Sequence, residues 1–83
     1  MTDPRDNPRE PTSKKDCYET TMHGYRIELD ISTGFAYCTI HWRRGGASLS
    51  CVQEFGQLGG VGIVKIDPAH LADIEAWAYR NGY

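Results

Sequence analysis

The feature that most constrains the fold is the segment 25–31, in which apolar and charged side chains alternate strictly. Successive side chains of a β-strand point to opposite faces, so this period of two predicts a strand with one buried and one solvated face. The apolar set is Tyr25, Ile27, Leu29 and Ile31, and the charged set is Arg26, Glu28 and Asp30. The apolar face therefore needs another element to cover it.

A second strand is predicted over residues 35–42, which are rich in aromatic and β-branched side chains, after a turn at residues 32–34. Its register follows from the faces that must meet. Pairing Leu29 with Cys38 and Ile27 with Ile40 joins apolar residues throughout, and it also sets Ile31 opposite Ala36 and Tyr25 opposite Trp42. A slip of one residue would place carboxylates among the apolar side chains, so the first register is predicted.

The next turn is predicted at residues 43–46, where two glycines supply the positive φ angles of a tight hairpin. The third strand then covers residues 48–55, with Leu49 opposite Ile40 and Cys51 opposite Cys38. A glycine-rich loop at 56–60 leads to a fourth strand over 61–66, whose valines and isoleucines lie on both faces. The glycine-rich segment 56–62 lacks the lysine and hydroxyl residue of a phosphate-binding loop, so it is interpreted as a connection.

A C-terminal helix is predicted after Asp67-Pro68, because aspartate is a strong N-cap and proline is tolerated at the first helical position. Asn81-Gly82 provides the stop. An apolar stripe at helical spacing comprises Leu71, Ile74, Trp77 and Ala78. The predicted fold is α+β: a four-stranded antiparallel sheet with this helix packed on the face that carries Ile27, Leu29, Cys38, Ile40, Leu49 and Cys51.

Residues 1–16 are predicted to form a disordered arm, which leaves residues 17–83 as one domain. The arm holds three of the four prolines, and its apolar content is too low to offset the entropy of ordering it. Its charges balance: Arg5, Arg9, Lys14 and Lys15 against Asp3, Asp6, Glu10 and Asp16. A neutral arm is not typical of nucleic-acid binding.

Composition excludes several classes of protein. The net charge of −2 disfavours non-specific binding to phosphate backbones. No apolar run approaches the roughly 20 residues of a membrane span, and no export signal follows the first residue. Three cysteines are an odd number without framework spacing, which indicates reduced thiols and a cytoplasmic location. The small core keeps homodimerisation open.

The residues that bear chemistry do not assemble into a catalytic or metal site in the predicted fold. Cys38 and His41 have a ligand-like spacing, but on a strand they project from opposite faces. The predicted registers bring Ser48, His41 and Glu28 together across three strands, as in a nucleophilic triad. An exposed sheet offers that triad no oxyanion hole and no exclusion of water. We therefore expect no enzyme activity, no metal and no cofactor.

The sheet face away from the helix is the predicted functional surface, because one helix covers only one side. Tyr37 is predicted opposite Val52, and Phe35 opposite Glu54, which gives an aromatic centre with a charged rim. The expected partner-binding residues of this face and its hairpin are Glu28, Asp30, Phe35, Tyr37, His41, Arg43, Arg44, Val52 and Glu54. The expected partner is a protein; a second copy and a merely solvated face are the alternatives.

Two resemblances bear on the partner. The order of four strands and a helix, with residues 62–66 leading into Leu71, Ile74 and Trp77, resembles the last strand and helix of the PC4-like single-strand-binding coactivators. That resemblance implies single-stranded nucleic acid as an alternative partner. The carboxylates Glu28, Asp30 and Glu54 lie on the same face and disfavour phosphates, so direct nucleic-acid binding is not the primary expectation.

In its size, acidity, N-terminal arm and lack of a catalytic motif, the chain also resembles small proteins encoded by phages and mobile elements, among them the anti-CRISPRs. This resemblance implies an inhibitor in the host cytoplasm that occludes a functional surface of a bacterial defence complex. Its contacts would be the aromatic sheet face and the Arg43-Arg44 hairpin. The carboxylates of that face would then meet basic protein surfaces that normally hold nucleic acid.

Overall fold

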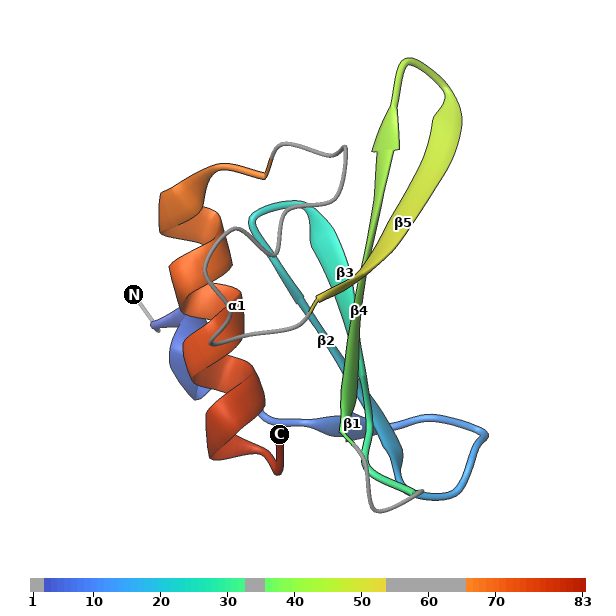
Figure 1. Ribbon diagram of the computed structural model, residues 1–83, viewed down its shortest axis with the longest axis vertical. Helices are drawn as coiled ribbons and strands as arrows, with labels where there is room; N and C mark the ends of the chain where they lie inside the picture. Colours follow the sequence, from blue (N-terminus) through green and yellow to red (C-terminus); the bar gives the residue numbers. More distant parts are fainter. Residues whose placement is uncertain (1–2, 33–35, 54–65) are drawn as a thin grey trace.

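The computed structural model describes residues 3–32, 36–53 and 66–83, which form an α+β domain (Figure 1). One C-terminal helix packs on one side of an antiparallel sheet, so the predicted class is confirmed. The described sheet has five strands in the order β1-β2-β3-β4-β5, where the sequence predicts four. In chain order the elements are the short 3-10 helix η1 (Pro4–Asp6), β1 (Glu10–Pro11), β2 (Cys17–Met22), β3 (Tyr25–Asp30), β4 (Tyr37–Arg44), β5 (Ala47–Gln53) and α1 (Pro68–Arg80).

The difference in strand number has two sources. Strands β1 and β2 are not predicted from the sequence, whereas the predicted fourth strand at 61–66 and the glycine-rich segment 56–62 fall almost wholly outside the described residues. Strand β2 pairs with β3 through a two-residue turn, His23-Gly24, in which both residues have positive φ, 52° and 80°. Such turns match the twist of a hairpin. The His23-Gly24 pair is therefore a local sequence signal for the hairpin that contains β2.

The pairing of β3 with β4 is the predicted one. Leu29 lies opposite Cys38, and Ile27 lies opposite Ile40. All four side chains are fully buried. The register is fixed because a one-residue slip would turn the whole apolar set of β3 toward solvent.

The pairing of β4 with β5 differs from the prediction by two residues. Ile40 lies opposite Cys51 instead of Leu49, and Cys38 lies opposite Gln53 instead of Cys51. The cause is the turn, in which Gly45 and Gly46 alone have positive φ, 58° and 84°, and Arg44 already pairs with Ala47. A shift of two residues preserves the alternation, so every side chain keeps its predicted face.

Helix α1 begins and ends as predicted. The Asp67 side chain accepts a hydrogen bond from the Ala69 amide at 2.9 Å, and Asn81 is the C-cap. Its buried side chains, Ile74, Trp77 and Ala78, join the core made by the inner face of the sheet, and the partly buried Leu71 packs against that core. In the described part of the chain, no helix has the length and apolar character needed to cross a membrane.

Cys17 and Cys38 are buried free thiols. Cys38 is fully buried, and this burial, with a smaller contribution from Cys51, raises its pKa to about 12. Its thiol therefore stays neutral near pH 7, and it packs as a small apolar side chain.

Residues 3–16, which belong to the segment predicted as a disordered arm, contain η1 and β1 in the structure. Residues 3–16 lie against the domain, with β1 paired to β2 and η1 beside α1 (Figure 1). The indole Nε1 of Trp77 donates a hydrogen bond to the Asn7 carbonyl at 3.0 Å, and the Arg80 guanidinium pairs with Asp6. The segment is ordered because its backbone and charges meet groups that the helix presents, although it buries no side chain in η1.

Candidate functional site: the open face of the sheet

The sheet has one covered and one uncovered side among the described residues. Helix α1 lies on one side, and no described helix or strand lies over the other, which is called the open face here (Figure 1). Alternation along β3, β4 and β5 brings six of the predicted partner-binding residues to it: Glu28, Asp30, Tyr37, His41, Arg43 and Val52. Arg44 ends β4 on the opposite side of the strand, and Phe35 and Glu54 lie outside the described residues.

The apolar centre of the open face is formed by Tyr37 and Val52, which are 48% and 57% exposed. The predicted direct pairing of these two residues is wrong, since Val52 lies opposite Thr39. Tyr37 is then its diagonal neighbour, still within reach of a long side chain. Both residues line a shallow hollow of about 250 Å³ together with Glu28 and Asp30. The predicted aromatic centre with acidic neighbours is therefore present, but Tyr37 and Val52 are diagonal neighbours and not a directly opposed pair.

Two carboxylates, Glu28 and Asp30, line this hollow together with the cation Lys14. Glu28 and Glu19 both accept hydrogen bonds from the Arg26 guanidinium, and the bond to Glu28 is the main cause of the raised pKa of Arg26. Asp30 accepts bonds from the Ser32 hydroxyl and amide, which lower the pKa of its carboxyl. Glu19, Glu28 and Asp30 are called the acidic end.

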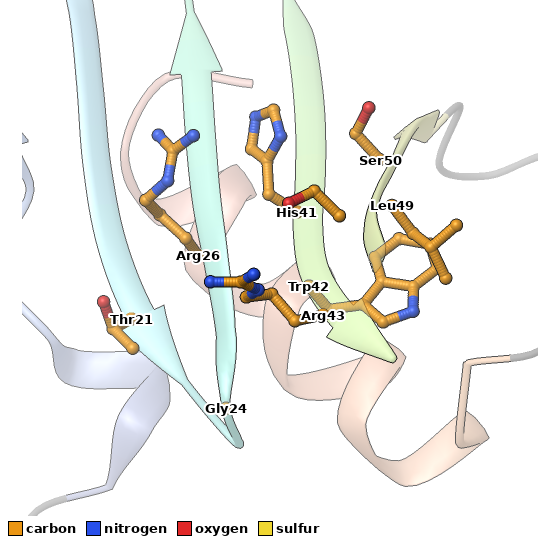
Figure 2. Close-up of a pocket in the computed structure, with 9 residues that line it drawn as sticks. Thr21, Gly24, Arg26, His41, Trp42, Arg43, Leu49 and Ser50 are labelled. Atoms are coloured by element: carbon orange, nitrogen blue, oxygen red, sulfur yellow. The ribbon is translucent and has the colours of Figure 1, made fainter. Parts of the chain in front are cut away.

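Cations and hydroxyls line the other end of the open face, near the tip of the β4–β5 hairpin. A hollow of about 560 Å³ there is lined by Thr21, Gly24, Arg26, His41, Trp42, Arg43, Ser48, Leu49 and Ser50, and it is called the hairpin hollow (Figure 2). Figure 2 shows the Arg26 and His41 side chains next to each other, with Arg43 reaching from β4 toward β3. Guanidinium groups only donate hydrogen bonds, so this hollow suits oxygen acceptors such as carboxylates.

His41 lies between the two ends, and the predicted triad of Ser48, His41 and Glu28 does not assemble around it. Its partner across β5 is Ser50, whereas Ser48 lies opposite Arg43. Its Nε2 atom is 3.4 Å from Glu28 Oε1, yet this buried nitrogen makes no hydrogen bond to the described residues. The Ser48–His41–Glu28 arrangement is therefore corrected: the two-residue shift in register separates the serine from the histidine.

A second polar cluster, which the sequence does not predict, joins the β2–β3 turn to α1. His23 contacts Asp73 at 2.7 Å and stacks on His70, with ring centroids 4.2 Å apart and planes 13° from parallel. Because ring nitrogens donate electron pairs in the plane of the ring, stacked imidazoles do not converge on one ion. Among the described residues, no group of three or more His, Cys, Asp or Glu side chains could hold a metal ion.

Comparison with known proteins gives no relative. No protein-family model, no curated protein and no solved structure matches this chain.

Proposed function

We propose that this protein is a non-enzymatic protein-binding module and that its contact surface is the open face of the sheet. The observation that carries the proposal is the pair Tyr37 and Val52, two large exposed side chains that line one hollow on a face left uncovered by the described elements. An aromatic centre surrounded by charged groups is a common arrangement in protein interfaces.

The charges around this centre favour a protein over other partners. The open face carries Glu28 and Asp30 with Lys14 beside them at one end, and arginines at the other, so it complements a surface of mixed charge. Single-stranded nucleic acid is the second candidate, favoured by Arg26 and Arg43 in the hairpin hollow. It ranks lower because Arg26 already shares its charge with two carboxylates, which also repel phosphates.

The more specific form of the proposal is an inhibitor of the anti-CRISPR type. Its support is the small, mildly acidic chain together with an acidic end that includes Glu28 and Asp30 on the open face. Such an end would occupy a basic surface that otherwise holds nucleic acid. The host cytoplasm is the compartment in which this activity would operate.

Affinity capture with matched variants tests the contact surface. We expect Tyr37→Ala to reduce capture of the partner by tenfold or more, because truncating a central aromatic typically costs about 2 kcal/mol or more. Tyr79→Ala is the control, since Tyr79 is 51% exposed but belongs to α1. Capture is quantified by mass spectrometry from bacterial lysate, and circular dichroism checks that both variants fold. Equal loss in the two variants, or no loss in Tyr37→Ala, would contradict the proposal.

A further inference from the structure

We propose that the open face binds a second copy of this chain, with the acidic end of each copy entering the hairpin hollow of the other. This inference rests on the proposed function and names its partner. It starts from the order of charges along the strands. From the acidic end toward the hairpin hollow, the side chains of β3 on the open face are Asp30, Glu28 and Arg26. On the neighbouring strand β4, Tyr37 lies at the acidic end and Arg43 lies at the hairpin hollow.

Two-fold symmetry turns this order into a complementary surface. Dimers of identical chains are commonly isologous, so the same face is used twice. When two sheets face each other, the two-fold axis lies in the plane between them. An axis parallel to the strands would place acidic end on acidic end. An axis across the strands places the acidic end of one copy over the hairpin hollow of the other, so electrostatics selects the second arrangement.

Particular residues meet in this arrangement when the axis crosses β4 midway between Tyr37 and Arg43. Glu28 of one copy then lies over Arg26 of the other. Asp30, on β3, lies over the β3 side of the other hollow, which is where Figure 2 shows the Arg43 side chain reaching. The exposed rings and methyls of Tyr37 and Val52 are covered by the same contact.

The ion pairs within one copy explain why Arg43 of one copy is suited to Asp30 of the other. Arg26 is paired with Glu28 and Glu19 of its own chain. Arg43 has no carboxylate partner among the described residues, and its hydrogen bond goes to the Gly46 carbonyl at 3.4 Å. Within the described part of the chain, the Arg43 guanidinium therefore has no opposite charge beside it, and it suits a single carboxylate. Asp30 supplies one: hydrogen bonds from Ser32 and Cys17, with Lys14 nearby, lower the pKa of its carboxyl, and a carboxylate has about four acceptor positions.

Charge reversal with mixing tests the pairing of Arg43 with Asp30. Analytical ultracentrifugation of the full chain from about 5 to about 500 µM covers the affinities of small interfaces. We expect the wild type to dimerise in this range. Arg43→Glu alone and Asp30→Arg alone should each weaken self-association about tenfold or more, since each places like charges together. An equimolar mixture of the two variants should restore a dimer, because both contacts in the mixed pair are again opposite in charge.

The controls separate this inference from the proposed function. Arg44→Glu makes the same charge change one residue away on the opposite side of β4, and it should leave the dimer intact. Circular dichroism establishes that each variant folds. A monomeric wild type, single variants that still dimerise, or a mixture that stays monomeric would each overturn the inference. If the wild type is monomeric while Tyr37→Ala still loses capture, the second copy is excluded and the binding function stands.

Discussion

Replacing Trp77 with alanine is expected to lower the free energy of unfolding by about 3–5 kcal/mol, the usual cost of removing a buried tryptophan. Trp77 is the largest fully buried side chain, and it lies in the cluster that joins α1 to the sheet. Its indole also holds the N-terminal segment through the Asn7 carbonyl. The loss therefore removes packing and a hydrogen bond together. Urea unfolding followed by circular dichroism measures it.

Trp77→Phe separates these two contributions. Phenylalanine keeps most of the apolar contact but cannot donate the bond to Asn7, so we expect a smaller loss of about 1–2 kcal/mol. A domain of this size has a total stability of only about 4–12 kcal/mol, so the alanine variant can lie close to complete unfolding. The phenylalanine variant then still gives a measurable transition. A cost below about 1 kcal/mol for Trp77→Ala would contradict the central place of Trp77 in the core.

Deleting residues 1–9 is expected to lower the free energy of unfolding by about 2–4 kcal/mol, because buried polar groups lose their partners. The Trp77 indole would lose its acceptor, and the buried Thr20 hydroxyl would lose the bond that it accepts from the Asn7 amide at 3.2 Å. Exposed contacts are lost as well, including the bond from Arg9 to the Asn81 carbonyl. The measurement is the midpoint and slope of urea unfolding, compared with the full chain.

Asp6→Ala is the control for the deletion. It removes the ion pair with Arg80, in which both side chains are more than half exposed, and leaves the backbone of the segment in place. Exposed pairs contribute little, so we expect a change below about 1 kcal/mol. If the deletion is as mild as this control, residues 1–9 contribute little to the stability of the fold, and the disordered arm predicted from the sequence is the better description of them.

The parts of the fold that the sequence predicts are those encoded by local patterns. The alternation that includes Ile27 and Leu29 specifies both β3 and its register with β4, because a slip of one residue would expose the core. Asp67-Pro68 specifies the start of α1 through a cap that depends only on neighbouring residues. The composition of the open face follows from the same alternation, and so Tyr37, His41 and Val52 are correctly placed on it.

The parts that the sequence does not predict depend on contacts between distant residues or on turn geometry. Strand β2 turns Thr20 toward the core, and a buried threonine weakens the apolar pattern. The order of the N-terminal segment depends on Trp77, which is far along the chain. The β4–β5 register depends on whether the turn has two or four residues, and Gly45-Gly46 permits both. The two-residue turn places Ser48 opposite Arg43 instead of His41, while every side chain of β5 stays on its predicted face of the sheet.

The central claim is that the open face is the contact surface. Its most direct test is hydroxyl-radical footprinting of the tyrosines in the protein alone and in the complex with its partner. Tyr37 and Tyr79 are similarly exposed, at 48% and 51%, but lie on the open face and on α1 respectively. If the open face is the contact surface, oxidation of Tyr37 falls on binding, and oxidation of Tyr79 stays unchanged. Protection of Tyr79 with Tyr37 still fully reactive would contradict the claim.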